Sequence, residues 1–172
     1  MPPARDALLA RVLEYAAREG VADKSLREIA AGVGTSHRML LYHFRSREGL
    51  LVAIVAEVER QQRVVLDGMD GSDADVMWNL WKQVSDPALR PYVRLFFATV
   101  GLAVQGVPGT RALLDTLTDP WLDQSAQRAD RTAVRLGVAT TRGLLLDLLA
   151  GADPDEVDAA YRLLIELWGR ER

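Results

Sequence analysis

The segment from residue 25 to residue 51 constrains this chain most, because it predicts two short helices joined by a tight turn. Ser25 and Glu28 have the spacing of a capping box, in which a hydroxyl and a carboxylate satisfy backbone N–H groups at a helix start. Gly34 is placed to end this first helix in the left-handed conformation, which glycine adopts without steric strain. The sequence therefore predicts a helix that begins at Ser25 and ends before Gly34.

The second helix of this segment is expected to have an inward and an outward face. Ser36, or Thr35 beside it, can cap its first turn, and Leu40 and Phe44 lie four residues apart on the inward face. At about 100° per residue, the outward face carries side chains suited to a DNA groove. Arginine can bond guanine at two positions, histidine and tyrosine can reach phosphates or base edges, and methionine can contact a thymine methyl. The predicted contacts on this helix are Ser36, His37, Arg38, Met39, Tyr42 and His43.

A long third helix is expected directly afterwards. Ser46 can cap it, and Arg47 lies in its first turn, where the helix N-terminus already favours phosphate. We therefore expect Arg47 to contact DNA phosphates, and Ser25 completes the predicted DNA-binding set. The helix continues to about Leu66, which would make it about 30 Å long. It is the natural connection between the N-terminal helices and the rest of the chain.

These residues resemble the DNA-binding domain of tetracycline-repressor-like (TetR family) transcription regulators, whose pattern runs T-x-x-x-I-A-x-x-x-G-V-S-x-x-x-L-Y-x-H-F-x-S-K-E-x-L. Thr35 stands where valine is common, and Leu41 replaces a tyrosine that usually touches the DNA backbone. The resemblance covers roughly the first quarter to third of the chain. The matching residues are Ser25, Ile29, Ala30, Gly34, Ser36, Leu40, His43, Phe44, Ser46, Glu48 and Leu50, with Arg47 in place of lysine.

Composition and charge fit a small all-α protein with a basic N-terminal part. The 172 residues are 49% hydrophobic and only 6% aromatic, and no segment clearly favours a strand. Residues 1 to 48 carry eight Lys or Arg and six Asp or Glu, so this part is positive although the whole chain has a net charge of −3. Because the excess is modest, DNA affinity should depend on the doubled contacts of a dimer.

Several chemistries are not expected. The chain has no cysteine, and both histidines, His37 and His43, lie on the predicted DNA-reading helix. We find no catalytic constellation and expect no enzymatic activity, no metal and no cofactor. The N-terminal stretch has charges within its apolar pattern, unlike a signal peptide, and the longest apolar run, residues 95–104, is too short to span a bilayer. We therefore expect a cytoplasmic protein with no membrane partner.

Helical periodicity continues along the whole sequence. A first amphipathic helix ends at Gly20 and completes a three-helix, helix-turn-helix head. We place the helix-turn-helix DNA-binding domain at residues 1–47 and a helical ligand-binding and dimerisation domain at residues 48–172. Gly137 could interrupt the fourth of the later helices. These later helices are expected at roughly 75–85, 87–105, 110–117, 120–150 and 154–169.

Large aromatic side chains gather between Met77 and Trp121. In the resembled family, this part of the chain commonly encloses a small-molecule pocket, and an apolar, aromatic lining suits such a pocket. The same residues could instead fill a core, which is the ordinary meaning of aromatics at helical spacing. The candidate ligand-binding residues are Trp78, Trp81, Phe96, Phe97 and Trp121.

The last two predicted helices are strongly apolar on one face. As the family's terminal helices do, they could pair with a second copy in a four-helix bundle, or they could close the core of a single chain. A body of this size cannot enclose every one of these large side chains, which favours the dimer. The candidate dimer-interface residues are Gly143, Leu145, Leu149, Tyr161, Leu164 and Trp168.

Two classes of function remain from the sequence. The first is a homodimeric transcription regulator, expected to be a repressor, which a small apolar or aromatic effector releases from a palindromic operator in double-stranded DNA. The second is a helical enzyme or adaptor that carries a helix-turn-helix head and needs a catalytic constellation within residues 70–172. Sequence-specific retention of duplex DNA that is lost on replacing Arg38 and Tyr42 would separate the two classes.

Overall fold

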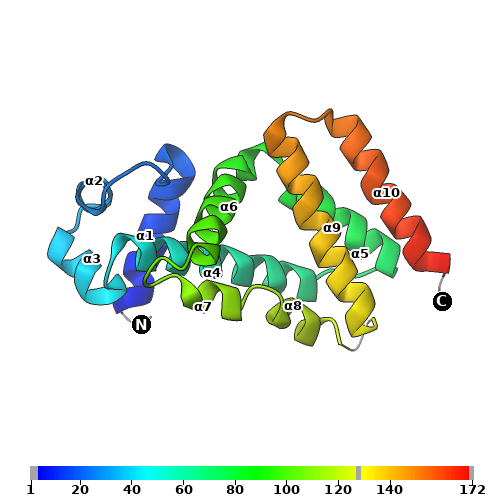
Figure 1. Ribbon diagram of the computed structural model, residues 1–172, viewed down its shortest axis with the longest axis horizontal. Coiled ribbons are helices and arrows are strands. Elements are labelled where there is room, and N and C mark those ends of the chain that lie inside the picture. The colour runs from blue at the N-terminus through cyan, green and yellow to red at the C-terminus, as the bar shows by residue number, and fades with distance from the viewer. Residues whose placement is uncertain (1–3, 127–128, 171–172) are drawn as a thin grey trace. The chain divides into compact units, whose positions relative to one another are not determined.

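The computed structural model describes residues 4–126 and 129–170, and these residues form helices without a strand (Figure 1). The predicted all-α fold is thus confirmed. No helix among the described residues is both long and apolar enough to cross a membrane. The helices are α1 (Ala4–Glu19), α2 (Leu26–Gly32), α3 (His37–Phe44), α4 (Arg47–Asp67), α5 (Asp73–Val84), the short 3-10 helix η1 (Pro87–Leu89), α6 (Arg90–Val104), α7 (Arg111–Asp115), α8 (Asp119–Gln124), α9 (Arg131–Ala150) and α10 (Pro154–Arg170).

The chain divides into two compact units. Unit 1 comprises Met1–Arg60 and Pro91–Asp115, and unit 2 comprises Gln61–Arg90 and Thr116–Arg172. Helix α4 therefore begins in unit 1 and ends in unit 2, while nearly all of α6 belongs to the same unit as the N-terminal helices. The boundary predicted after residue 47 does not coincide with the division between these two units, and it stays a prediction.

Local side-chain chemistry sets the helix ends of unit 1. The backbone N–H of Ser25 donates to the Glu28 carboxylate at 2.7 Å, and the Glu28 N–H donates to the Ser25 hydroxyl at 3.3 Å. The predicted capping box is therefore present. Ser36, and not Thr35, caps α3, because its hydroxyl accepts from the Met39 N–H at 3.2 Å. Gly34 has a φ of +67°, the left-handed conformation that the turn requires.

The core of unit 1 joins its helices through apolar side chains. Tyr15 of α1 lies so close to Gly32 of α2 that a Cβ on Gly32 would overlap the tyrosine ring. Helix α6 is tied to α1 by the Tyr92 hydroxyl, which donates to the Leu13 carbonyl at 2.8 Å. Burial raises the pKa of Tyr92, so this hydroxyl keeps its proton and remains a donor. Fully buried residues of this unit include Val12, Ile29, Leu40, Leu50 and Ile54.

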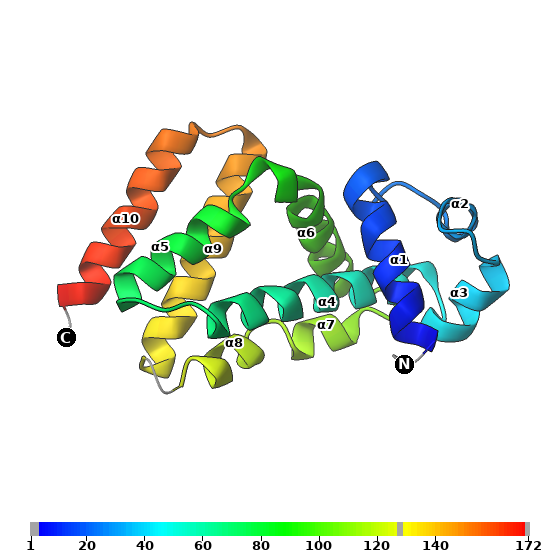
Figure 2. The same ribbon diagram turned by 180° about the vertical axis from the view of Figure 1, so that it is seen from behind.

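The core of unit 2 is centred on Trp81 of α5, which is fully buried. Its ring stacks on Tyr161 of α10, with 4.6 Å between the ring centroids, and its Nε1 donates to the Asp158 carboxylate at 2.7 Å. Val157 and Leu164 of α10 complete this cluster. Helices α9 and α10 form an antiparallel hairpin with α5 beside α10, as both views show (Figures 1 and 2).

The single helix predicted for residues 120–150 is wrong. Helix α8 ends at Gln124 and α9 begins only at Arg131, while residues 127 and 128 of the predicted helix lie outside the described residues. The Asp130 carboxylate starts α9 by accepting from the Thr132 N–H at 2.8 Å and the Ala133 N–H at 3.2 Å. Gly137 does not break the helix. Instead, the missing Cβ lets the Trp168 ring approach α9 closely.

Two further helix starts differ from the prediction. Helix α5 begins at Asp73, two residues early, because Ser72 and Asp75 form a second capping box. The helix predicted from residue 87 begins as the 3-10 helix η1, and the regular helix starts at Arg90. The Asp86 carboxylate caps η1 by accepting from the Ala88 N–H at 2.8 Å. Both differences are local and leave the order of the helices unchanged.

Candidate nucleic-acid interface

Helix α3 presents the predicted faces. Leu40 and Phe44 are buried in unit 1, whereas Arg38 is exposed and Tyr42 leaves 71% of its surface accessible. Met39 beside them is exposed as well. The outward face of α3 therefore combines a guanidinium, a phenol and a thioether, groups that can reach base edges and a thymine methyl. The other predicted contacts on α3, His37 and His43, are half-buried.

The two serine caps hold the helix-turn-helix geometry. Each hydroxyl oxygen accepts a backbone N–H, Ser25 from Glu28 and Ser36 from Met39. The hydroxyl proton of Ser36 can still donate to another acceptor, so capping and phosphate binding are compatible at this serine. Hydrogen bonds from the Ser25 side chain, and then from its backbone N–H, hold the pKa of Glu28 below its usual value. The capping carboxylate is therefore ionised at neutral pH.

The Arg47 guanidinium is hydrogen-bonded within unit 1, whereas a phosphate ligand is expected to have its donors free. Its Nε donates to the Lys24 carbonyl at 2.7 Å, and its Nη2 donates to the Ala22 carbonyl. Its remaining Nη1 lies 4.0 Å from the Glu48 carboxylate. The guanidinium thus braces the segment between α1 and α2 inside unit 1. The sequence offered no signal for this, because the partners are backbone carbonyls 23 and 25 residues earlier.

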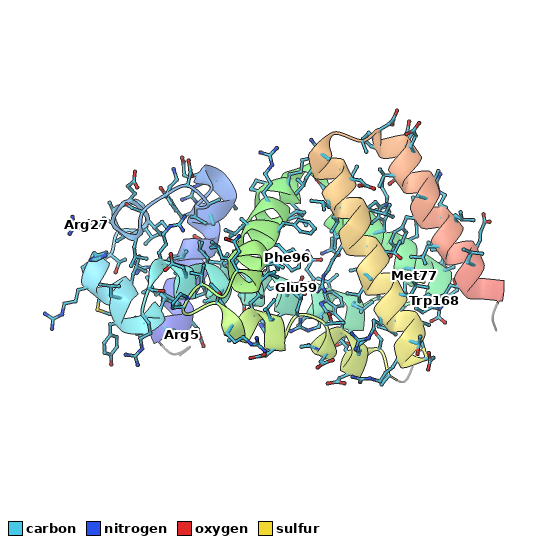
Figure 3. All side chains as sticks on the ribbon, in the orientation of Figure 1. Arg5, Arg27, Glu59, Met77, Phe96 and Trp168 are labelled. Atoms are coloured by element: carbon cyan, nitrogen blue, oxygen red, sulfur yellow. The ribbon has the colours of Figure 1, made fainter. Side chains whose placement is uncertain are left out.

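Two exposed arginines near α3, Arg27 and Arg45, lie outside the predicted DNA-binding set. Arg27 lies in the first turn of α2, and Figure 3 shows its side chain projecting away from that helix. Arg45 directly follows α3 and is also exposed. Exposure next to the helix-turn-helix was the signal that could have found both, but it becomes visible only in the fold.

The five candidate ligand-binding residues belong to both units. Trp78, Trp81 and Trp121 lie in unit 2, and Phe96 and Phe97 lie in unit 1. Trp81 has no exposed surface and serves the core, so a ligand has no access to it in this conformation. Phe96 and Phe97 are half-buried and meet edge to face, with 5.2 Å between their ring centroids.

The other two tryptophans lie under cationic side chains within unit 2. The Arg162 guanidinium lies 4.4 Å from the centroid of the Trp78 ring, and the Lys82 ammonium lies 5.6 Å from it. The Arg63 guanidinium lies 5.7 Å from the centroid of Trp121. Both rings are half-buried, so each retains accessible surface.

The apolar residues of α9 and α10 divide between core and surface. Tyr161 and Leu164 lie in the core of unit 2, which removes them from any surface that a partner could contact. Leu145 packs half-buried against that core, while Leu149 and Trp168 are also half-buried, and Gly143 is exposed. Tyr161 and Leu164 thus lie on the core face of α10, while other leucines of these two helices lie on the exposed face.

A separate apolar stripe is exposed on this hairpin. Its α9 residues recur at the three-and-four spacing of a helix-pairing seam. The leucines of the stripe leave 50–59% of their surface accessible. Its members are Leu136, Ala139, Gly143, Leu146 and Ala150 on α9 and Ala160, Leu163 and Leu167 on α10. We call these eight residues the hairpin stripe.

The helix-turn-helix geometry of unit 1 accords with a family comparison. Residues 8–54 match the model described as bacterial regulatory proteins, tetR family. The chain has the N-terminal domain of the TetR family. Its match spans α1, α2, α3 and the first part of α4, which is the region whose capping and burial have just been described. The resemblance predicted from the sequence is thereby confirmed.

Solved structures extend this likeness to the whole fold. A transcriptional regulator from Rhodococcus sp. Rha1 gives a TM-score of 0.71 at 20% identity, covering 96% of this chain and 95% of that one. A TetR transcriptional regulator from Rhodococcus sp. RHA1 gives 0.67 at 22% identity, covering 95% and 94%. The multidrug binding protein EbrR, complexed with ethidium, gives 0.72 at 22% identity, covering 97% and 99%. No curated protein sequence matches the chain.

Gly34 and Ser36 keep the TetR-family pattern in the turn, while Thr35 between them and Leu41 on α3 depart from it. Leu41, which replaces the family's tyrosine, is exposed. Its side chain has no hydrogen-bonding group and so cannot replace that tyrosine as a donor to phosphate. Within the described residues, no group of three or more His, Asp or Glu side chains is arranged to hold a metal ion.

Proposed function

We propose that this chain, whose residues 8–54 match the TetR-family model, is a DNA-binding transcription regulator that acts as a homodimer on a palindromic operator. In this proposal it is a repressor that a small apolar or aromatic ligand releases from DNA. The observation that carries the proposal is the outward face of α3, where Arg38, Met39 and Tyr42 are exposed above buried Leu40 and Phe44. A rigid helix with a polar, basic outer face is the element that helix-turn-helix proteins place in the major groove.

The proposed contacts fall into two kinds. Arg38, Met39 and Tyr42 are assigned to base edges, because they lie on the face opposite the core. Ser25, Ser36, His37 and His43 are assigned to phosphates or to the rims of the groove, because they lie at helix starts or at the edges of α3. Arg27, exposed in the first turn of α2, joins the phosphate contacts. Phosphate contacts position the helix, and base contacts supply specificity.

We assign dimerisation to the hairpin stripe rather than to the face that carries Tyr161 and Leu164. An exposed run of leucine, alanine and glycine on two neighbouring helices can pair with a second copy as a four-helix bundle. Gly143 allows the two copies of α9 to approach closely, since it carries no side chain and is exposed. A twofold dimer requires two recognition helices about 34 Å apart, one turn of DNA, which explains a palindromic operator.

Support for an aromatic effector comes from EbrR, which has the same fold and whose structures contain ethidium and proflavin. Of the candidate residues, Phe96 and Phe97 in unit 1 and Trp78 and Trp121 in unit 2 are half-buried, so each ring keeps some accessible surface. A ligand releases DNA only to the extent that it binds the DNA-incompetent state better. A hundredfold preference corresponds to about 2.7 kcal/mol of coupling per site.

The test is selection of bound duplexes from a random pool, followed by titration of the best site with Arg38→Ala. Because a bidentate arginine–guanine contact is lost, we expect binding to weaken by about 1–3 kcal/mol and one base position in each half-site to lose its preference. Arg60→Ala is the matched control, since it removes the same charge from α4, about 20 Å along the helix from Arg47. Equal binding of all duplexes by the wild-type protein would overturn the proposal.

A further inference from the structure

The turn between α3 and α4 holds Arg45 in an unusual backbone conformation. Its φ is 71° and its ψ is −46°, and of the described residues other than glycine it alone has a positive φ. The Ser46 N–H donates to the Phe44 carbonyl at 2.8 Å, which closes a three-residue γ-turn around Arg45. The γ-turn with positive φ at its central residue is rare and strained for an L-amino acid.

The surrounding residues enforce this conformation. A Cβ on Gly49 would overlap the Phe44 carbonyl oxygen, so the chain passes this point only because residue 49 is glycine. The Ser46 hydroxyl accepts from the Gly49 N–H at 3.0 Å and fixes the first turn of α4. The Arg45 N–H donates to the Leu41 carbonyl at 2.9 Å and fixes the last turn of α3. Arg45 is thus strained by a turn that is held from both sides.

A glycine at position 45 would avoid this strain, because it has no Cβ to collide with the following backbone. The arginine therefore lowers the stability of the fold where it stands. Its side chain is exposed and makes no ion pair or side-chain hydrogen bond with the described residues that would compensate for the strain. Strained residues of this kind are concentrated at functional sites, so the exposed Arg45 side chain is a candidate for contact with a partner.

The position and charge of Arg45 identify the chemistry of that partner. Arg45 directly follows α3, the helix whose exposed residues include Arg38 and Tyr42. The Arg5 guanidinium lies 5.3 Å from the ring centroid of neighbouring Phe44, so a second cation is close to the turn. The guanidinium of Arg47 is already bonded to the Lys24 and Ala22 carbonyls. Of the two arginines of this turn, Arg45 is therefore the one with an exposed guanidinium.

We propose that Arg45, rather than Arg47, supplies the DNA phosphate contact of the α3–α4 turn. This inference rests on the proposed DNA-binding function and assigns within it a contact that the sequence pattern had placed on Arg47. The contact is to the sugar-phosphate backbone, so it contributes to affinity for every sequence alike and not to base preference. The Arg45 guanidinium is exposed, whereas the Arg47 guanidinium already donates to backbone carbonyls within unit 1.

The experiment compares Arg45→Gly, Arg45→Ala and Arg45→Lys for binding to a duplex of random sequence at several salt concentrations, and for Tm without DNA. Loss of one phosphate contact lowers the salt slope by about 0.9 for each head and weakens binding roughly tenfold per head at 0.1 M salt. Arg45→Gly and Arg45→Ala should both show this loss, while Arg45→Lys keeps the wild-type slope. Only Arg45→Gly relieves the strain, so it alone should raise Tm, by about 2–4 °C.

Arg60→Ala serves again as the control, since this exposed charge lies well beyond the Debye length of about 10 Å at 0.1 M salt from the turn. It should leave the salt slope at the wild-type value. Wild-type slopes for Arg45→Gly and Arg45→Ala would overturn the inference while leaving the proposed function intact. A wild-type protein that shows no salt-dependent binding to duplex DNA would overturn both.

Discussion

Asp158 bonds two side chains of α5 at the core of unit 2. Its carboxylate accepts from the Nε1 of fully buried Trp81 at 2.7 Å and pairs with the Lys82 ammonium at 2.9 Å. Burial by itself would raise the pKa of Asp158, but the hydrogen bonds from Lys82 and Trp81 outweigh it and hold the pKa below its usual value of 3.8. The ionised carboxylate is thus the form that the fold favours.

Replacing Asp158 with alanine should destabilise unit 2, because the indole N–H of Trp81 would be left buried without an acceptor. We expect a loss of about 1–3 kcal/mol in the free energy of unfolding, measured by denaturant titration with circular dichroism. Asp158→Asn is the matched control, since its carbonyl can still accept from the indole. If the alanine and asparagine variants are equally destabilised, the hydrogen bond to Trp81 is not the cause.

Comparison of the wild-type protein with Asp158→Asn also tests how the stability of the fold depends on pH. Because the pKa of Asp158 is lower in the folded state than its usual 3.8, the carboxylate stabilises the fold above about that pH, and this contribution is lost as the pH falls through the folded-state value. The wild-type protein should therefore lose more stability than Asp158→Asn between pH 5 and strongly acidic pH. Parallel stability curves for the two proteins would contradict the assignment.

At the scale of the helices, the ends that one side chain determines locally were predictable. Ser25 with Glu28, and Gly34 after them, mark α2 because each acts on backbone groups within a few residues. The bracing by Arg47 was not predictable, because its partners are carbonyls without any side-chain signature. The burial of Tyr161 on α10 was not predictable either, because its ring stacks on Trp81, which lies about 80 residues earlier in the chain.

The gap between α8 and α9 gives a test at this scale. Asp130→Ala removes the carboxylate that accepts from the Thr132 and Ala133 N–H groups, so the first turn of α9 should fray. We expect Tm to fall by about 2–4 °C, as for the loss of an ordinary helix cap. Asp130→Ser, which keeps a capping oxygen, should recover most of the loss. An unchanged Tm for the alanine variant would show that the cap does not hold α9.

At the scale of the whole molecule, the hairpin stripe allows the proposed dimerisation to be tested separately from folding. Leu163 is exposed in the single chain, whereas its neighbour Leu164 is buried in the core of unit 2. Leu163→Asp should therefore give folded monomers, while Leu164→Asp should unfold the protein, because a buried unpaired charge costs several kcal/mol. Sedimentation velocity together with circular dichroism distinguishes the two results. A wild-type protein that is monomeric at micromolar concentration would contradict the assigned interface.

The placement of the tryptophans has a consequence for spectroscopy. All four, Trp78, Trp81, Trp121 and Trp168, lie in unit 2, and unit 1 contains none. Intrinsic tryptophan emission therefore reports on unit 2 alone, whereas the far-ultraviolet signal of the helices reports on both units. If the two units unfold together, the two signals must give one transition midpoint. If they unfold separately, the tryptophan emission will change in only one of two steps. The step without a change in emission will be the unfolding of unit 1, which carries the helix-turn-helix.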